Sequence, residues 1–587
     1  MSRRTKGYKL LILATSAAAC AACGGGGGGG DSQTPQPLPA ATAPPTAPPR
    51  MNRGPVLVKP VPDVHFLTGH PIDYDLAAFF SDPDGDVLSY EFIAMDTGAV
   101  SRLGLAWSGS RVVGRAMETG ALEIQVRAKD PSGSTQVDFF YLGVDRNSPP
   151  VLAAPQPDRL LAIGAPVDIE LTQGGTAFTD ADGDPLTYEV SLESEPRGMA
   201  ISGLRVQGGI NSVGLVRVRV VASDGAGGVV EDGFSLAAAG PVPGPPTLPA
   251  TSYRYADEAL PLPYIYRLSS EIVIPLWDTQ RPDNRTTDAG ATLGRVLFYD
   301  KRLSITNTVA CGSCHEQEHG FAQPTRFSVG AQGVPTRRNA MGLTDARYSI
   351  RGFYFWDARA PTLERLAVMP IEESMELGNP MSLLVPKLQA TPFYPPLFEA
   401  AFGTPEVTAD RIAKALAQFL RALISYQAKF DRAMFGMTAN DYPDASAILT
   451  PEELRGLEIF GSNPSVCGQC HGDGSLTMTD PSSNGLDLVS ADPGAGNGLF
   501  RPPSLRNIAV TAPYMHDGRF ATLREVIEHY DHGIVDTPSL GTQLRQGSYG
   551  PPIRFNFSEE DKRALEAFLH TLTDDQFLHD PKFSDPF

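Results

Sequence analysis

Two short strings, each a Cys-x-x-Cys-His run, constrain this chain more than any other feature. They read Cys311-Gly-Ser-Cys314-His315 and Cys467-Gly-Gln-Cys470-His471. The spacing is typical of haem c attachment, because two thiols bond to the haem vinyl groups while the adjacent histidine binds the iron as proximal ligand. A purely disulfide use of these cysteines would leave both histidines unexplained. The strings therefore predict two covalently bound haem c groups.

Length, charge and cysteine content limit the organisation and the partners of the chain. At 587 residues it is too long for one hydrophobic core, so several domains are expected. A net charge of −19 argues against nucleic acid as a partner. Of the six cysteines, the two outside the haem strings are Cys20 and Cys23, so none remains for a disulfide in the body of the chain.

The first 23 residues have the pattern of a targeting segment. Basic residues precede a short apolar stretch from residue 10 that is too short to span a membrane. The segment resembles a bacterial lipoprotein signal, with Cys20 or Cys23 as the lipidated residue; simple secretion is the alternative. We expect an exported protein, facing the periplasm or at the cell surface and anchored to the outer membrane. Residues 24–60, rich in Gly and Pro, are expected to form a tether.

An internal repeat follows the tether. Residues 80–86 (FSDPDGD) recur as residues 178–184 (FTDADGD), and alternating runs such as residues 122–127 lie between the turn-like segments. This pattern predicts two β-sandwiches, over residues 61–147 and 148–240. They resemble cadherin-like or immunoglobulin-like modules. The aspartate clusters are compatible with calcium binding or with ion-free Asx turns, and the sequence leaves both readings open.

Helical patterns begin after a linker at residues 241–265. Thr408 precedes apolar residues at helical spacing, Thr450 and Glu453 form a capping-box pattern, and Ser558 precedes a last helix. We predict a mainly α, two-lobed di-haem cytochrome c domain. Its lobes are a peroxidatic haem lobe at residues 266–440 and an electron-transfer haem lobe at 441–587. The fold class is thus multidomain, with two all-β sandwich repeats before the α domain.

Four separated motifs carry a family resemblance over residues 270–575. They are LGRVLFYDKRLS at 293–304, FWDAR at 355–359, PPSLRN at 502–507 and TAPYMHDG at 511–518. Together they resemble the bacterial di-haem cytochrome c peroxidase family, which includes the MauG branch. The resemblance implies that the N-terminal haem reacts with hydrogen peroxide and that the C-terminal haem stores and relays electrons. It also implies His315 and His471 as proximal ligands, with Trp356 between the haems.

The resemblance also assigns the distal side of the first haem. Glu376 would take a proton from bound peroxide and return it to the departing oxygen, and Pro370 matches the family nearby. Leu366 stands where the family usually has a glutamine, which makes the pocket less polar. Ala331 falls near the position of a histidine that blocks the iron in many members. Alanine cannot ligate iron, so the first haem is expected to be five-coordinate and open to peroxide.

Around the second haem the resemblance assigns a sixth ligand and a calcium site. Tyr530 replaces the methionine ligand of the peroxidases, as in the MauG branch, and His516 would lie near this haem. Tyr530 as a core aromatic, with His529 or nothing as ligand, is the alternative. The family's interhaem calcium ion would be held by Asn339, Thr511 and Pro513.

The resemblance favours an enzyme acting on hydrogen peroxide. It would use high-valent iron shared over both haems to oxidise either an electron-donor protein or a side chain of a partner protein. The non-enzymatic alternative is a surface-tethered di-haem electron carrier. Glu376 discriminates between them, because a carrier needs no carboxylate over an open iron. The sequence does not name the substrate, and it leaves open whether the chain is a homodimer.

Overall fold

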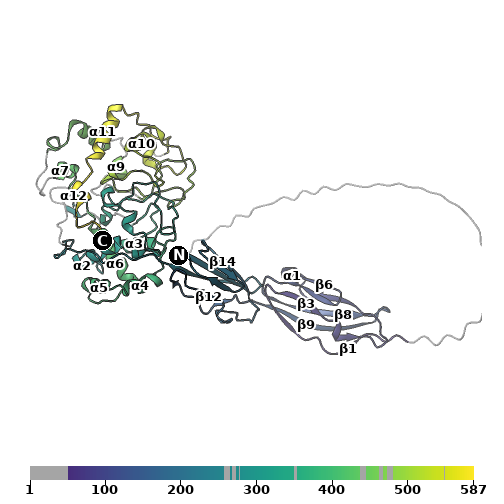
Figure 1. Cartoon of the computed structure of the whole chain (residues 1–587). Helices are drawn as coiled ribbons and strands as arrows, with labels where there is room; N and C mark the ends of the chain where they lie inside the picture. The colour runs from purple at the N-terminus through teal and green to yellow at the C-terminus, as the bar shows by residue number, and fades with distance from the viewer. Residues whose placement is uncertain are drawn as a thin grey trace, which may run out of the picture.

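The chain forms an elongated β-sandwich arm joined to a two-lobed helical region (Figure 1). The computed structural model describes residues 51–256, 265–267, 273–275, 278–348, 353–435, 444–461, 467–471, 480–547 and 549–587. The predicted targeting segment, with Cys20 and Cys23, lies outside these residues. The predicted fold class is confirmed: β-sandwiches come first and a mainly α region follows.

The first sandwich buries one apolar core between two sheets, which have the strand orders β2-β9-β8-β5 and β3-β7-β6. The β2–β9 pair is parallel, and the β8–β9 pair is antiparallel, with Ile124 opposite Phe140. The elements of this unit are β1 (Val56–Leu57), β2 (Val64–Leu67), β3 (Pro71–Asp75), η1 (Ala77–Phe79), β4 (Phe80–Ser81), β5 (Ser89–Ala94), α1 (Thr97–Arg102), β6 (Leu105–Ser108), β7 (Arg111–Arg115), β8 (Gly120–Lys129) and β9 (Thr135–Asp145).

The second sandwich repeats this topology, with the orders β11-β18-β17-β14 and β12-β16-β15. The parallel pair is now β11–β18, and Val218 opposite Phe234 repeats the central antiparallel pair. Its strands are β10 (Val151–Leu152), β11 (Arg159–Leu160), β12 (Val167–Glu170), β13 (Phe178–Thr179), β14 (Thr187–Leu192), β15 (Met199–Ser202), β16 (Arg205–Gly208), β17 (Gly214–Ser223) and β18 (Val229–Ala238). The sequence repeat is therefore a repeat of structure.

The first sandwich begins earlier than the sequence predicts. Residues 51–60, expected to belong to the tether, lie against the sandwich. Arg53 forms a 2.8 Å ion pair with Asp84, and the Asn52 amide donates to Asp130 over 2.7 Å. These side chains satisfy carboxylates at the turn ends of the sandwich, which a flexible tether would not do.

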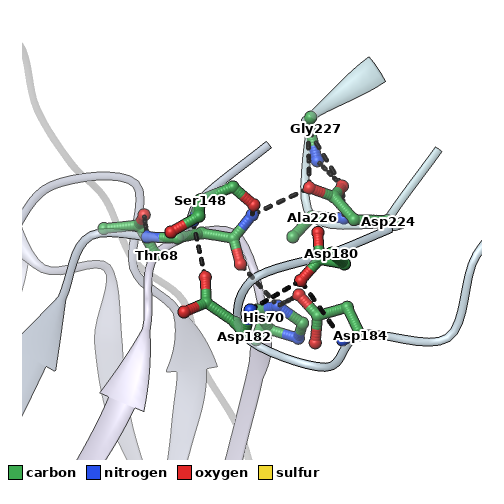
Figure 2. A network of polar contacts seen from close by, with 12 residues as sticks. Thr68, His70, Ser148, Asp180, Asp182, Asp184, Asp224, Ala226 and Gly227 are labelled. Atoms are coloured by element: carbon green, nitrogen blue, oxygen red, sulfur yellow. Dashed lines mark hydrogen bonds and ion pairs between the residues drawn. The ribbon is translucent and has the colours of Figure 1, made fainter. Parts of the chain in front are cut away.

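A polar joint connects the two sandwiches (Figure 2). Nε2 of His70 in the first unit lies 3.0 Å from Oδ2 of Asp184 in the second. The same nitrogen lies 3.1 Å from Oδ1 of Asn147, whose amide nitrogen donates to Asp224 over 2.8 Å. Side chains of both units therefore bond directly across the joint.

The second aspartate cluster lies in this joint. Oδ1 of Asp180 accepts hydrogen bonds from the backbone N–H groups of Asp182 and Asp184, at 2.9 and 3.3 Å, and Asp182 accepts one from the Ser148 N–H at 2.6 Å. This is the geometry of an Asx-type turn. The three carboxylates also bring oxygen atoms within 4.8 Å of one another. Calcium binding at these repeats stays a prediction.

The helical region contains α-helices separated by connections that range from a few residues to several tens of residues. Its α-helices are α2 (Asp288–Tyr299), α3 (Leu363–Glu372), α4 (Met381–Gln389), α5 (Tyr394–Phe402), α6 (Ala409–Ala422), α7 (Lys429–Phe435), α8 (Pro451–Gly461), α9 (Cys467–His471), α10 (Leu523–Glu528), α11 (Glu559–His570) and α12 (Asp575–His579). The shorter turns include η3 (Lys301–Leu303), η4 (Cys311–Ser313), η5 (Gln317–His319), η6 (Ala346–Tyr348), η7 (Ala445–Ala447), η8 (Ile508–Val510), η9 (His529–Gly533) and η10 (Thr542–Leu544), and β19 (Ile265–Arg267) pairs with β20 (Val273–Pro275).

Each lobe is built on a close helix crossing just before its haem string. In the first lobe, α2 crosses α6 at Gly294, where an added Cβ would lie 2.0 Å from the Ala415 carbonyl oxygen. In the second lobe, α8 crosses α11 at Gly456, where it would lie 1.9 Å from the Ala564 carbonyl oxygen. Only glycine permits these backbone approaches. Each crossing therefore lies on the helix that precedes a haem string, α2 in the first lobe and α8 in the second.

The division between the lobes differs from the predicted break at residue 440. Phe430 packs in the core of the second lobe, whereas Phe577 and Phe583 pack in the core of the first. The Tyr299 hydroxyl also donates to the Phe583 carbonyl over 2.8 Å. The chain therefore enters the second lobe before residue 430 and returns to the first at α12, because aromatic side chains at both ends find their apolar contacts there.

Helix starts agree with the capping patterns in the sequence. Thr450 Oγ1 accepts from the Glu453 N–H at 3.2 Å, and the Glu453 carboxylate accepts from the Thr450 N–H at 2.7 Å. Thr408 and Ser558 cap α6 and α11, where their side chains accept hydrogen bonds from the backbone N–H groups of Arg411 and Asp561. Among the helices within the described ranges, none is long and apolar enough to cross a membrane.

Candidate haem sites and the region between them

The first haem string forms a tight turn after α2. The backbone N–H groups of Cys314 and His315 both donate to the Cys311 carbonyl, at 3.1 and 3.0 Å. This turn gathers the two thiols and the imidazole within one turn of chain. Both cysteines are free thiols, and burial raises the pKa of Cys311 to about 12.

The ring of His315 is prepared for metal binding through one nitrogen. Its Nδ1 lies 2.7 Å from the Phe321 carbonyl oxygen, which favours Nδ1 as the protonated nitrogen, and the Met341 backbone also hydrogen-bonds to this ring. Burial lowers the pKa of this imidazole and favours its neutral form. Two free thiols and a neutral, oriented imidazole fit the donor set of a covalently attached haem.

Glu376 lies next to this turn, on the segment that follows α3. Burial raises its pKa to about 7, opposed by nearby Arg359 and assisted by Glu373. The Glu376 charge in turn acts on both Cys311 and Cys314, whose pKa values rise chiefly through burial. A carboxylate therefore lies within electrostatic reach of both attachment thiols, with a pKa suited to proton transfer at neutral pH.

The end of α3 holds Glu376 in place. The carbonyl of Pro370, inside α3, accepts a hydrogen bond from the Leu377 N–H at 3.1 Å. Leu366 is buried on the same helix. The Ala331 N–H donates to the Glu376 carbonyl over 2.7 Å, so the loop that carries Ala331 lies directly beside the segment of the carboxylate.

The second haem string forms the single helical turn α9. Its cysteines, Cys467 and Cys470, are partly exposed and form no disulfide among the described residues. Tyr530 lies close to both of them. Burial raises its pKa to about 12, with further contributions from Cys470 and Cys467 and an opposing hydrogen bond from the Asn484 side chain. The structure thus brings Tyr530 and the second attachment turn together.

A π-helical turn sets the direction of Tyr530. Leu523, Val526, Ile527 and Tyr530 stand at positions i, i+3, i+4 and i+7, a spacing that predicts one shared helix face. The capping box at Thr522 is present, and Leu523 and Ile527 are buried in the second-lobe core. However, α10 ends at Glu528 and continues as η9, whose wider turn moves Tyr530 against a different cluster with Ile534, Leu540 and Leu544. The prediction of a shared face is wrong for this reason.

His529, the alternative ligand, has another contact. Its Nε2 lies 3.0 Å from the Asn484 carbonyl oxygen, and burial lowers the pKa of its ring. This imidazole therefore has a backbone partner, whereas the neighbouring Tyr530 lies within electrostatic reach of the attachment cysteines.

Trp356 lies at the boundary of the two lobes. Its indole Nε1–H donates to the Asn339 carbonyl over 3.0 Å, and its own carbonyl accepts from the Arg501 N–H at 2.7 Å. The His516 ring lies 6.5 Å from the indole at 72°, and Phe500 stacks on His516 at 3.7 Å. Aromatic rings from both lobes are thus in contact at Trp356.

The residues assigned to calcium line one cavity. Asn339, Thr511 and Pro513 border a space of about 50 Å³ beside Trp356. Backbone and amide oxygens at such a site suit calcium. The ion itself stays a prediction.

Comparison with known proteins decides the family. The family model of the di-haem cytochrome c peroxidases matches residues 288–439. The chain is 35% identical over 302 residues to the methylamine utilization protein MauG of Methylorubrum extorquens, covering 49% of this chain and 79% of the relative. The chain belongs to the di-haem cytochrome c peroxidase family.

Two further proteins are similar to this chain. The cytochrome c551 peroxidase of Nitrosomonas europaea is 30% identical, with 49% of this chain and 80% of the relative covered. The second is a MauG-like protein associated with microbial copper homeostasis, known from a crystal structure, which is 31% identical in sequence. The match covers 53% of this chain and 98% of that protein, with a TM-score of 0.47. As a family member, the chain is a peroxidase-type oxidoreductase with two haem c groups.

One charged residue that connects the two lobes, Arg338, was not indicated by any sequence pattern. Arg338 donates to Asp357 over 2.6 Å and to Asp492 over 2.7 Å, and these hydrogen bonds raise its pKa. It ties the FWDAR motif to a loop of the second lobe. Asp357 belongs to a recognised motif, but Asp492 lies in an unremarkable stretch. Only the three-dimensional contact identifies Arg338 as an interlobe anchor.

Proposed function

We propose that this protein reduces hydrogen peroxide at the Cys311–His315 haem and uses the resulting oxidising equivalents on a protein, as MauG-like enzymes would. The observation that carries the proposal is the raised pKa of Glu376, about 7, next to the first attachment turn. The haem, when bound, supplies the iron that binds peroxide and holds the oxidising equivalents.

Glu376 performs the proton transfer. At neutral pH a group with a pKa of about 7 is populated in both forms, so its carboxylate accepts the proton of one peroxide oxygen. The same proton then passes to the other oxygen, which leaves as water when the O–O bond breaks. Leu366, buried on α3, offers no proton donor at the position where the family usually has a glutamine.

Three other residues determine where the oxidising equivalents go. Ala331 cannot block the iron, so peroxide reacts with the resting protein. Tyr530 would hold the iron of the second haem through its oxygen. An oxygen ligand stabilises ferric iron, which disfavours electron uptake from a soluble cytochrome. Trp356, between the lobes, passes electrons between the haems. These features favour a partner-protein side chain as substrate over a small electron-donor protein.

Calcium and export complete the proposal. Asn339, Thr511 and Pro513 would hold the interhaem calcium ion, and His516 and Pro370 support the rings and backbone around the sites. The protein acts outside the cytoplasm, where haem c is matured, and is held at the membrane by a lipid on Cys20 or Cys23. Loss of bound calcium after chelation, followed by metal analysis, tests the first statement.

Electron paramagnetic resonance of the purified ferric protein tests the unequal haems. The proposal predicts one high-spin signal from the first haem and one low-spin signal from the second. A Tyr530→Phe variant should change only the low-spin signal. Two low-spin haems without peroxide reactivity would instead favour a di-haem electron carrier.

A further inference from the structure

The second β-sandwich contacts the first haem lobe through a small apolar cluster. Leu215 of β17, Ala237 of β18 and Ile305 of the lobe are buried together, and Ala331 and Leu383 pack against them. Ile305 precedes the first haem string, and Ala331 lies in the 328–336 loop. The cluster therefore joins the sandwich to two segments that border the peroxidatic site.

Hydrogen bonds surround this cluster. Ser382 Oγ donates to Asp158 Oδ2 over 2.7 Å, and the other oxygen of Asp158 accepts from the Ser235 N–H. The Gly240 N–H donates to the Thr306 carbonyl over 2.9 Å. The end of the sandwich is thus bonded to the lobe at several points.

The same contact reaches Glu376 through two backbone links. Ile305 donates to the Leu377 carbonyl over 3.0 Å, and Ala331 donates to the Glu376 carbonyl over 2.7 Å. The 328–336 loop is itself closed by a Val329–Pro335 bridge. Gly330 in this loop lies against the backbone of Met375, the residue before Glu376. An added Cβ at Gly330 would be 2.0 Å from the Met375 carbonyl oxygen. Movement of this loop would therefore move the carboxylate segment.

We propose that the second β-sandwich is a positioning element of the peroxidatic site: Leu215 and Ala237 hold the 328–336 loop, and through it the backbone of Glu376, in the reactive arrangement. The catalytic role of the sandwich rests on the proposed function, whereas the contact between the sandwich and the lobe does not depend on it. In this arrangement the methyl group of Ala331 completes an apolar contact with the sandwich. A small apolar residue at this position thus has a second use besides leaving the iron open.

Leu215→Ala in the full-length holoprotein tests the proposal, with Leu236→Ala as matched control. Leu236 is buried in the sandwich's own core, so its loss weakens the sandwich without touching the lobe. We expect Leu215→Ala to speed hydrogen exchange of the 328–336 and 374–378 backbone. Cyanide binding to the first haem should change in rate, and the peroxide reaction should slow by about tenfold or more. The spectrum of the second haem should stay unchanged.

Two further variants keep the test decisive. Leu215→Met should restore the exchange and cyanide rates, and Ser382→Ala, on the lobe side, should shift them in the same direction as Leu215→Ala. Equal exchange and cyanide rates in Leu215→Ala and the wild type would overturn the proposal, as would equal effects of Leu236→Ala. If the wild type fails to react with peroxide while Leu215→Ala still alters loop exchange and cyanide binding, the proposed function fails and this inference stands.

Discussion

The indole of Trp356 is anchored to Asn339, a residue that itself bonds to the other lobe. Trp356 Nε1–H donates to the Asn339 carbonyl over 3.0 Å, and the Asn339 N–H donates to the His516 carbonyl over 2.8 Å. The ring that would carry electrons between the haems is therefore held by a hydrogen-bonded chain that crosses the lobe boundary.

Replacement of Trp356 by Phe should separate electron transfer from haem structure. The variant keeps an aromatic ring but loses the Nε1–H bond and the oxidisable indole. We expect ferric spectra of both haems like those of the wild type and slower oxidation of any protein substrate, measured in the steady state. Unchanged turnover with intact haems would show that electrons cross by another path.

Glu376→Gln should remove the proton transfer while keeping the shape of the side chain. We expect the peroxide reaction, measured by stopped-flow spectroscopy, to slow by about 10²–10⁴-fold, the usual contribution of a general acid–base group. Glu373→Gln is the control, because Glu373 is exposed three residues away. A similar loss in both variants would point to charge alone rather than to proton transfer.

The pH dependence follows from the raised pKa of Glu376, about 7. The ionised carboxylate is the form that accepts the peroxide proton. The reaction rate should therefore rise with pH through about 7, where the protonated fraction falls, and level off above it. This inflection should be absent in Glu376→Gln. A wild-type profile that is flat from pH 5 to about 8 contradicts the assignment.

Tyr530→Met should raise the reduction potential of the second haem alone. A thioether stabilises ferrous iron relative to an oxygen ligand, so the shift is positive. Spectroelectrochemical titration measures it, and the first haem serves as internal reference. If both potentials stay at the wild-type values, Tyr530 is a core aromatic and not a ligand.

The two lobes are also held by a buried ion network. Arg506 bonds to Asp431 at 2.9 Å and to Asp345 at 3.2 Å, with all three side chains almost fully buried. Arg506→Met leaves two buried carboxylates without their cation, which should lower the free energy of unfolding by about 3–5 kcal/mol. Thermal unfolding of the holoprotein measures this. Arg455→Met, which removes the ion pair between the exposed Arg455 and the partly exposed Asp561, should have little effect.

Local sequence signals predicted much of this structure. The haem strings, the capping boxes at Thr450 and Thr522, and the repeated sandwiches follow from residue spacing and periodicity, which act over a few residues. The π-helical turn at Tyr530 does not, because neither neighbour in sequence requires it. Long-range contacts could not be predicted either, because no local pattern indicates that Ala331 packs on Leu215, or that the chain end with Phe583 returns to the first lobe.

Peroxide titration of the purified, fully ferric protein, followed by optical spectroscopy, tests the central claim most directly. The open first haem and the carboxylate of Glu376 predict an immediate spectral change with stoichiometric hydrogen peroxide and without any reductant. A protein that changes its spectrum only after one haem has been reduced would contradict the account.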